Sequence, residues 1–399
     1  MTQIAYVSTY IPKKCGLATY THHLRQSVKD AKMWKGIDPV IALTDESERA
    51  DFDSNAIWPL LKEQRSAYSK MAQKINRSHI SLVSLQHEFG IFGGQAGSFI
   101  LDFVRELNKP LITTFHTVFK NPEEPYRSIQ QEIADRSDRI IVMNRKAISY
   151  LCSSFDLPED KIVYLPHGTP VPNRQKRDDF RRSLQWTNRK VIMTFGLLSP
   201  GKGIEMILDV LPDVVRSVPE VLYVIVGQTH PEVKKREGEY YRHQLQELIR
   251  QKQLENNVMM VDRYVSEEEL ITYITACDLY ITPYPGLQQI TSGTLAYAIG
   301  LGRPVLSTPY SYAQDVLAMY GDQLLIPFDN RTKWSETIAA MLADPIELQQ
   351  WEKRMERIGK LLHWPLVGKK HALLFLRTIQ MAKEKFAGIG GNQVVSITG

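Results

Sequence analysis

The sequence predicts an α/β protein with two doubly wound parallel sheets, and three observations carry that prediction. Short runs rich in Val, Ile and Leu alternate with longer amphipathic runs along almost the whole chain, which is the pattern of repeated βαβ units. The short runs are apolar on both faces, as strands covered by helices must be. Each half of the chain also opens with a strand, a glycine-bearing loop and a helix. We therefore expect two similar domains that face a central cleft.

The strands can be placed from these apolar runs. In the first half we expect them at 4–9, 39–43, 81–86, 111–115, 139–143 and 161–165. In the second half we expect them at 190–195, 222–226, 258–261, 279–282, 305–307 and 324–327. Helical patterns lie between the strands, and the clearest begins at Ser266, which forms a capping-box pattern with Glu269.

Length and composition exclude several classes of protein. A chain of 399 residues predicts two domains or one large one. Its 43% hydrophobic and 23% charged residues are ordinary globular values, which excludes a disordered chain, a collagen-like fibre and a coiled coil. The net charge of +5 is smaller than a dedicated nucleic-acid binder would carry, so no nucleic-acid partner is expected. It would still allow weak attraction to an anionic membrane surface.

The cysteines and the N-terminus indicate the compartment. Cys15, Cys152 and Cys277 are the three cysteines, an odd number without metal-ligand spacing, which favours a reducing environment. The N-terminus reads as a strand rather than a signal peptide, and no apolar run is long enough to span a membrane. We expect a cytoplasmic protein, with peripheral contact at the inner face of the membrane as an open alternative.

A change in composition at 171–190 marks the domain boundary. This segment is rich in Arg and Lys, and we interpret it as a link followed by a polar helix. Its charges predict a solvated face, with an anionic lipid or phosphate contact as the alternative. The predicted domains are 1–172 and 173–365, with a late helix at about 366–390 that crosses back to the first domain.

The strongest local motif runs from Phe195 to Ile204. Gly196 follows a strand, and Lys202 and Gly203 precede a helix, so the backbone can approach a ligand and the lysine can neutralise a phosphate. The spacing is not that of a P-loop. The alternative is an ordinary strand-to-helix turn with an exposed lysine.

A second motif follows the strand at 279–282. Its loop is rich in proline and leads into Thr291, Ser292, Gly293 and Thr294, which precede an alanine-bearing helix. Capping hydroxyls and free N–H groups at such a helix start predict a second anion cradle. The alternative is an N-capped core helix whose small residues only permit close packing.

The first half carries further candidates at its strand ends. Gly16 lies in the first strand-to-helix loop, where it permits close backbone approach, and we expect Cys15 to be a small loop residue. His87, His116 and His167 each follow an expected strand, where α/β proteins gather functional groups. A structural role for each histidine is the alternative, and their spacing does not define a metal site.

These motifs together resemble the retaining nucleotide-sugar glycosyltransferases of family 4. The similarity covers nearly the whole chain and rests on the order and spacing of short motifs. They are the Gly16 loop, Thr114-Phe115-His116, Leu165-Pro166-His167-Gly168, Gly196-x-Leu198-x-x-x-Lys202-Gly203, Val224-Ile225-Val226-Gly227, Asp278-Leu279-Tyr280, Gln289-x7-Tyr297, Gly302-x-Pro304-Val305 and the Trp364 tail. The resemblance implies the GT-B architecture, with two Rossmann-like domains, and transfer with retention of anomeric configuration.

The resemblance also implies residue roles. The catalytic group would comprise His116, Lys202 and Gln289. The donor-binding group would comprise Gly16, Gly196, Lys202, Arg263, Tyr264, Thr291, Ser292, Gly293, Thr294 and Tyr297. On the acceptor side we expect His87, Phe89 and Phe119, with specificity set by the loops at 88–95 and 119–126. Core or loop packing is the alternative for Phe89, Phe92 and Phe119. We expect no metal and no cofactor, with a UDP- or GDP-sugar as co-substrate and a carbohydrate or lipid-linked glycan as acceptor.

Three positions depart from the family pattern. Leu197 stands where the family usually has Arg, and Gln289 and Tyr297 replace two glutamates. Gln289 can still hydrogen-bond the donor sugar, and Tyr297 offers the ribose one hydroxyl. Arg263, Arg236 and Lys235 are the candidates to compensate for the missing cation. Two other functions therefore stay open: a glycoside phosphorylase or nucleotide-sugar epimerase on the same scaffold, and a non-catalytic partner subunit.

Overall fold

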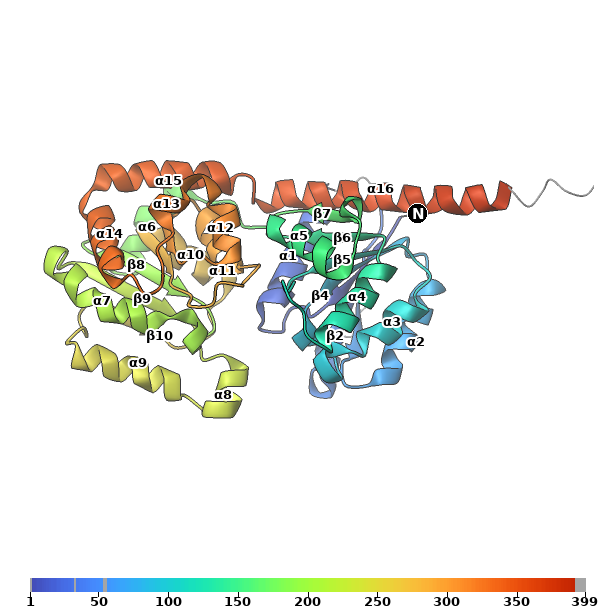
Figure 1. Cartoon of the computed structure of the whole chain (residues 1–399), viewed down its shortest axis with the longest axis horizontal. Coiled ribbons are helices and arrows are strands. Elements are labelled where there is room, and N and C mark those ends of the chain that lie inside the picture. The colour runs from blue at the N-terminus through green and yellow to red at the C-terminus, as the bar shows by residue number, and fades with distance from the viewer. Residues whose placement is uncertain (1, 32–33, 53–55, 392–399) are drawn as a thin grey trace, which may run out of the picture. The chain divides into compact units, whose positions relative to one another are not determined.

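The computed structural model describes residues 2–31, 34–52 and 56–391. The chain divides into two compact units (Figure 1). Unit 1 comprises Met1–Gly168 and Trp364–Gly399, and unit 2 comprises Thr169–His363. Among the helices in the described ranges, none combines the length and apolar character that a membrane crossing requires.

Unit 1 is a parallel sheet covered by helices. Its elements are β1 (Ile4–Ser8), α1 (Gly16–Ala31), β2 (Val40–Thr44), β3 (Ile57–Leu61), α2 (Arg65–Asn76), β4 (Leu82–His87), α3 (Ile100–Glu106), β5 (Leu111–Phe115), α4 (Tyr126–Arg136), β6 (Arg139–Val142), α5 (Arg145–Phe155), β7 (Ile162–Tyr164) and α16 (Trp364–Gly391). The seven strands lie in the order β3-β2-β1-β4-β5-β6-β7. All residues of β1, β2, β4 and β5 are buried, which explains their uninterrupted apolar runs.

The late helix expected at about 366–390 is present as α16, and it packs on α1. Its Gly368 meets Ser27 of α1 so closely that an added Cβ would lie 2.5 Å from the Ser27 backbone. Val367, Phe375 and Ile379 of α16 are buried in the same apolar cluster as β1. The C-terminal helix is therefore an integral part of unit 1.

Strand β3 is the element of this sheet that the sequence analysis missed. It contains Pro59, and proline removes a hydrogen-bond donor that a central strand needs. The structure places β3 at the edge of the sheet, paired only with β2 among the described strands. An edge strand tolerates proline, so the run 57–61 was wrongly left out of the predicted strands.

Unit 2 repeats the parallel architecture with fewer strands. Its main elements are α6 (Arg177–Ser183), β8 (Lys190–Phe195), α7 (Ile204–Ser217), β9 (Val221–Val226), α8 (Pro231–Glu237), α9 (Tyr240–Gln251), β10 (Val258–Val261), α10 (Glu267–Ala276), β11 (Leu279–Thr282), α11 (Gly293–Gly300), β12 (Val305–Ser307), α12 (Ser311–Val316), α13 (Gly321–Leu324), α14 (Arg331–Ala343) and α15 (Pro345–Gly359). The five strands lie in the order β10-β9-β8-β11-β12. The capping box of Ser266 and Glu269 begins α10 as predicted.

One expectation about unit 2 was wrong. The run 324–327 is not a strand: α13 ends at Leu324, and only an isolated bridge joins Leu325 to Ser307. The polar helix expected after residue 171 is present as α6, which has no buried residue, and two of its arginines are also paired. Arg177 and Arg181 of α6 bind the carboxylate of Asp278 at 2.7 and 3.2 Å, so these two cations tie α6 to the sheet.

Each sheet has one point at which its strand order reverses. The chain runs from β1 through β2 to β3, then returns to β4 beside β1; likewise it runs from β8 to β10 and returns to β11 beside β8. With right-handed crossovers, the helices that follow the two central strands lie on opposite faces. The loops at the carboxyl ends of β1 and β4, and of β8 and β11, then form the crevices where open α/β sheets bind ligands.

Candidate functional site

The switch point of unit 2 brings the two predicted glycine-rich loops together. Gly203 has a positive φ of 61°, and a Cβ on it would lie 2.1 Å from the Pro283 carbonyl oxygen. Only glycine allows the β8 loop to approach the β11 loop this closely. Gly196 also has a positive φ, of 146°, and an added Cβ would lie 3.3 Å from the Lys202 side chain. The glycines therefore bring Lys202 to the start of α11.

Lys202 lies in a network of hydroxyl groups. Its Nζ donates to the Tyr284 hydroxyl at 3.1 Å and lies 4.3 Å from the centre of the Tyr284 ring. The Tyr284 hydroxyl is 3.1 Å from Thr294 Oγ1, which is 3.2 Å from Ser292 Oγ. Three hydroxyls and one ammonium group thus meet at the N-terminus of α11.

The start of α11 adds backbone donors to this network. Ser292 is the N-cap, and its Oγ accepts the N–H of Leu295 at 3.3 Å. The first N–H groups of a helix have no acceptor within the helix, so the groups of Gly293 and Thr294 stay available for a ligand. The positive end of the helix dipole lies here too. With Lys202, this arrangement can hold a phosphate or diphosphate.

Gln289 and Thr291 lie in the exposed loop before α11. The Gln289 side-chain amide donates to the Thr291 carbonyl oxygen at 2.9 Å, and residues 285–289 are exposed. Gln289 therefore shapes the loop in this structure, and the described contacts do not join it to Lys202.

Tyr297 of α11 holds a carboxylate from a neighbouring helix. It lies one helical turn after Gly293 in α11, and its hydroxyl donates to Glu267 Oε1 at 2.7 Å. Glu267 begins α10, the helix with the capping box. A carboxylate is therefore present beside position 297, although it belongs to a different helix. Sequence analysis did not select Glu267, because its thirty-residue separation from Tyr297 gives no local signal.

The candidates for a replacement cation are already paired. Arg263 makes two hydrogen bonds to the Glu269 carboxylate, at 2.9 and 2.6 Å. Arg236 pairs with Glu237 at 2.6 Å. Leu197 and the side chain of Tyr264 are half-buried. Both arginines face a carboxylate in the structure as described, so their role as the replacement cation stays a prediction.

Two further residues around this site were missed. Tyr284 bridges Lys202 to Thr294, as described above. Arg242 is buried, and its guanidinium binds the Asp262 carboxylate at 2.6 Å and the Gly227 carbonyl oxygen at 2.9 Å. Gly227 in turn packs against Gly196, so Arg242 supports the loop that carries the predicted donor residues. A lone arginine in a helix offers no sequence signal for such a role.

At the switch point of unit 1, His116 is held in one tautomer. Gln86 donates its amide N–H to Ser84 Oγ, so its Oε1 faces His116 Nε2 at 3.0 Å. That oxygen can only accept, so Nε2 carries the proton and Nδ1 is an acceptor. Burial, with smaller contributions from His167 and His87, lowers the pKa of His116 to about 3. His116 is therefore a neutral imidazole at pH 7.

His167 shares this surrounding. Its ring packs edge-on against Tyr20, with centroids 5.0 Å apart, and Tyr20 also packs against His116 and Trp364. Burial lowers the pKa of His167 to about 4. The two histidines that follow β5 and β7 thus meet in one uncharged aromatic cluster.

The acceptor-side prediction needs a correction at His87. Its side chain is 0% exposed and is enclosed by Phe89, Phe92 and Phe115, so it forms part of the core and offers no surface to an acceptor. Burial lowers its pKa to about 3. The alternative of a structural role therefore fits His87.

Phe89 is also largely enclosed, but it supports two more accessible rings. It stacks on Phe119 with centroids 5.9 Å apart and packs edge-on against Tyr126. Phe119 is half-buried, and Tyr126 is 38% exposed. The accessible aromatic surface is therefore formed by Phe119 and Tyr126; Tyr126 lies in the expected acceptor loop 119–126 but was not selected individually.

The strand ends beside these rings carry polar groups. Glu88 accepts a hydrogen bond from the Thr117 hydroxyl at 2.7 Å, and burial raises the pKa of its carboxyl group. Gly16 begins α1, and an added Cβ would meet nothing within 4 Å, so the space beside it is open. Cys15 Sγ accepts the Ala18 N–H at 3.4 Å, which agrees with its expected role as a loop residue.

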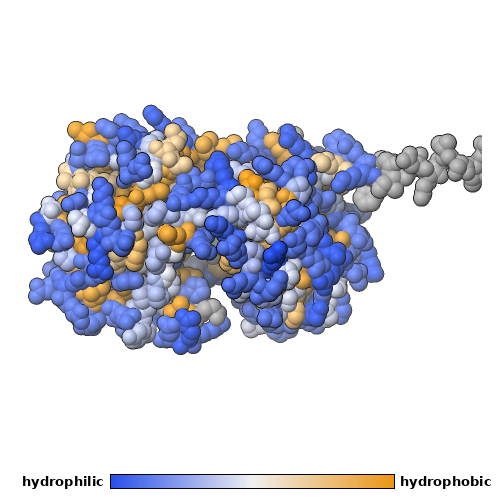
Figure 2. All heavy atoms as spheres, in the orientation of Figure 1, coloured by the Kyte–Doolittle hydropathy of each residue, from blue (hydrophilic) through white to orange (hydrophobic). Residues whose placement is uncertain are grey.

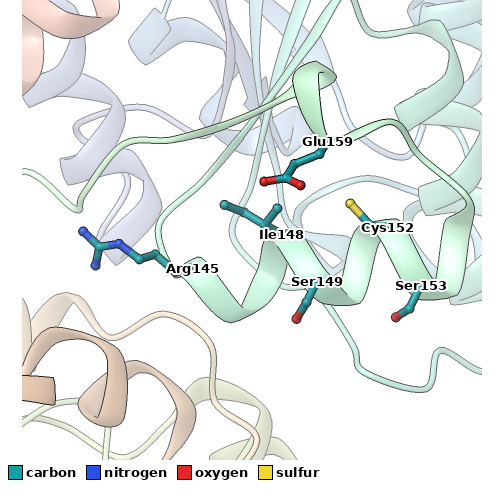
Figure 3. A pocket seen from close by; sticks show the side chains of 6 residues that line it. All are labelled: Arg145, Ile148, Ser149, Cys152, Ser153 and Glu159. Carbon is teal, nitrogen blue, oxygen red and sulfur yellow. The ribbon is translucent and has the colours of Figure 1, made fainter.

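A hollow of about 570 Å³ on α5 lies apart from the predicted site residues (Figure 3). Arg145 stands at one end of it, and Cys152 and Glu159 face each other at the other. Burial and the Glu159 charge raise the pKa of the Cys152 thiol, which disfavours the reactive thiolate. Across the described chain, no three His, Cys, Asp or Glu side chains gather as a metal site would require.

Comparison with known proteins identifies the class. The fold resembles that of solved GT-B glycosyltransferases. One is Anabaena HepE in complex with UDP and glucose, with a TM-score of 0.74 and 14% identity, where the match covers 94% of this chain and 100% of that chain. Sucrose-phosphate synthase from Thermosynechococcus elongatus is similar to the same degree (TM-score 0.74, 17% identity, 97% and 100%). Two parallel sheets with this topology therefore define a GT-B fold.

Sequence profiles then give the family. Residues 16–171 match "Glycosyltransferase Family 4", and residues 176–358 match "Glycosyl transferases group 1". The chain therefore belongs to glycosyltransferase family 4. A GDP-mannose:glycolipid 4-beta-D-mannosyltransferase from Xanthomonas campestris pv. campestris is 33% identical over 160 residues, 40% of this chain and 36% of that protein. The chain thus matches about a third of the length of that relative.

Proposed function

We propose that this protein transfers a hexosyl group from a nucleoside-diphosphate sugar to a glycolipid or other carbohydrate acceptor. The observation that carries the proposal is the network of Lys202, Tyr284, Thr294 and Ser292 at the start of α11. It combines a cation, hydroxyl groups and backbone donors at the switch point of a parallel sheet, which suits a diphosphate.

The proposed chemistry places Lys202 beside the leaving group. When the sugar–phosphate bond breaks, negative charge grows on the nucleoside diphosphate. Lys202 and the N–H groups of Gly293 and Thr294 would stabilise that charge in place, without reorganisation during the reaction. Since these groups supply positive potential, we propose that transfer proceeds without an added metal ion. Gly196 keeps the ligand side of the loop open.

GDP-mannose is the first donor to test. The Xanthomonas relative is named for GDP-mannose and a glycolipid acceptor. Glu267, oriented by Tyr297, offers a carboxylate that accepts hydrogen bonds from sugar hydroxyls. We propose that this pair binds the donor ribose. Arg242, through Gly227 and Asp262, would position the neighbouring loop at Arg263 and Tyr264.

Acceptor recognition is proposed for unit 1. Phe119 and Tyr126 present aromatic surface on which a sugar ring can stack, and the neutral Nδ1 of His116 accepts a hydrogen bond from a hydroxyl group. Gly16 leaves space for a ligand at the start of α1. Neutral groups suit an uncharged polyhydroxyl acceptor better than an anionic one.

The stereochemical outcome has two candidates. Family resemblance implies retention, which we propose first. Inversion is the second candidate, because the Xanthomonas relative is named for a β-mannosyl product and a neutral His116 can act as a general base. Proton NMR of the isolated product, made from an α-linked donor, distinguishes the two: an α-linkage supports retention and a β-linkage supports inversion.

The deciding experiment is a nucleoside-diphosphate release assay. Purified protein is incubated with GDP-mannose and a panel of UDP-, GDP- and ADP-sugars, with and without a mixed glycolipid extract, in the presence of EDTA. We expect release from one donor, increased by acceptor. Silence with every donor from folded protein would contradict the proposal and favour the non-catalytic partner. Sugar phosphate formed from oligosaccharide and inorganic phosphate would favour a phosphorylase.

A further inference from the structure

The outer face of α16 combines basic and apolar side chains. Lys369, Leu373 and Arg377 follow one another at intervals of four residues, so they lie on one side of the helix. Lys370 and Met381 lie about three turns apart on the same side. All five side chains are exposed, with Leu373 and Met381 each 41% accessible. We call these five residues the α16 outer face.

Packing fixes the direction of this face. Val367, Phe375 and Ile379 hold the opposite side of α16 in the apolar cluster of unit 1, and Gly368 lies against Ser27 of α1. The helix therefore cannot turn its apolar outer residues inward without losing that core. In Figure 1, α16 runs along the upper edge of unit 1, and the same edge in Figure 2 shows hydrophobic spheres between hydrophilic ones.

The charge on this side of α16 is strongly one-sided. The exposed side chains from 365 to 385 include Lys369, Lys370, Arg377, Lys383 and Lys385, against the single carboxylate of Glu384. Among the described residues, no carboxylate forms an ion pair with Lys369, Lys370 or Arg377. Arg139 of β6 adds a sixth cation, because its guanidinium contacts Met381 Sδ at 3.4 Å.

We propose that the α16 outer face docks on the surface of an anionic phospholipid bilayer. The charged ends of the lysine and arginine side chains would contact lipid phosphates. Their aliphatic parts, together with the side chains of Leu373 and Met381, would enter the interfacial layer. Unpaired cations on a fixed helix face gain the most from a nearby negative surface. The inference rests on the proposed function in one respect: docking would bring the enzyme to a lipid-linked acceptor.

The test is co-sedimentation of the full chain with vesicles. One set contains phosphatidylcholine alone, and the other contains 30% phosphatidylglycerol. Lys369→Glu/Arg377→Glu reverses two charges on the outer face. The matched control, Lys70→Glu/Arg77→Glu, makes the same change in net charge at α2 and at the residue that caps its C-terminus. The α2 label lies toward the lower edge of unit 1 in Figure 1. A third variant, Leu373→Ser/Met381→Ser, removes the apolar contribution.

We expect the wild type and the α2 variant to bind the anionic vesicles and not the neutral ones, with binding weakened by salt. The α16 charge variant should bind about tenfold more weakly or worse, and the serine variant should be intermediate. Equal loss in the α2 variant, or equal binding to neutral vesicles, overturns the proposal. Circular dichroism checks folding of each variant.

Enzyme activity separates this proposal from the proposed function. Nucleoside-diphosphate release with a water-soluble acceptor should be the same in the wild type and the α16 variants, because none of the substituted residues belongs to the proposed donor-binding group. If no variant releases nucleoside diphosphate but vesicle binding follows the expected order, the catalytic proposal fails and the docking surface stands. If release is normal but no vesicle binding occurs, the docking surface fails alone.

Discussion

The two switch points have the same topology, but one carries a positive charge and the other is lined by neutral histidines. In unit 2, Lys202 and three hydroxyl groups meet at the start of α11. In unit 1, His116 and His167 meet around Tyr20, and burial lowers their pKa values to about 3 and 4, so both are uncharged at pH 7. The strand order determines where each crevice forms, and the side chains determine what it can bind.

The difference extends to the charges nearby. Lys13 lies in the loop after β1, but Asp45 and Glu48 pair with it at 3.3 and 2.9 Å. The unit 1 crevice therefore gains little positive potential from it. In unit 2 the ammonium group of Lys202 faces hydroxyl groups and an aromatic ring. From these charges we expect a phosphate to be better stabilised in unit 2 and a neutral sugar to be better accommodated in unit 1.

The largest expected effect comes from removing the Lys202 charge. Lys202→Ala should lower kcat/KM for the donor by about 100- to 1,000-fold, since one preorganised group that stabilises developing charge is worth that much in other enzymes. The measurement is steady-state nucleoside-diphosphate release. Lys190→Ala, at the opposite end of β8, is the matched control and should retain activity. If Lys202→Ala has an unchanged rate, the positive charge that distinguishes the switch point of unit 2 from that of unit 1 has no role in the reaction.

The second effect concerns acid stability and unit 1. His87 has a pKa of about 3 in the folded state against 6.5 ordinarily, so between these values only the unfolded chain binds the proton. The titration of His87 therefore lowers the free energy of unfolding progressively as pH falls below about 6.5. At pH 5 the cost is about 2 kcal/mol, from about 1.4 kcal/mol per pH unit. His87→Phe should remove this cost while fitting the apolar surroundings.

Urea unfolding at pH 7 and pH 5 measures this contribution. We expect His87→Phe to be more acid-resistant than the wild type, with a smaller difference between the proteins at pH 7. The control is His79→Gln, because His79 is an exposed residue of the same unit. If the wild type and His87→Phe lose the same free energy of unfolding between pH 7 and pH 5, His87 does not have the lowered pKa that its burial implies.

Most of the fold was predictable because parallel strands are apolar on both faces. That pattern located β1, β8 and most of their neighbours, and the glycine-bearing loops located the two switch points. It failed where the physical signal was different: Pro59 concealed an edge strand, and the apolar run at 324–327 had a helix end inside it. Periodicity describes burial, and it does not distinguish a buried strand from a buried turn of the same length.

The site was predictable only as far as local motifs reach. Lys202, Ser292 and Thr294 were selected from the residues beside them, and the structure brings them together. Glu267 and Arg242 were missed because their roles depend on contacts between separate helices. His87 was selected by its place at a strand end, but burial decides its role, and sequence position does not reveal which side of the strand a histidine faces in the folded chain.

A smaller effect is expected from the Tyr297–Glu267 contact. Tyr297→Phe removes the hydroxyl that orients Glu267 and should raise the donor KM about tenfold, with kcat changed much less, since a hydrogen bond to a charged group is worth about 1.5–3 kcal/mol. Glu267→Gln should have a similar effect. A 2′-deoxyribose donor tests the proposed ribose contact: wild type should discriminate against it, and Glu267→Gln should discriminate less. Equal discrimination by both proteins would contradict the role.

The smallest effect is expected at Arg263, and it tests whether Lys202 is the cation on which unit 2 depends. Arg263 is half-exposed and its charge is balanced by Glu269, and exposed ion pairs of this kind contribute about 1 kcal/mol or less. Arg263→Ala should therefore change donor kcat/KM by about twofold or less in the release assay. A loss approaching that of Lys202→Ala would mean that Arg263 leaves Glu269 when the donor binds and supplies the charge missing at Leu197. The contrast between the two switch points would then be larger in the bound state than in the free one.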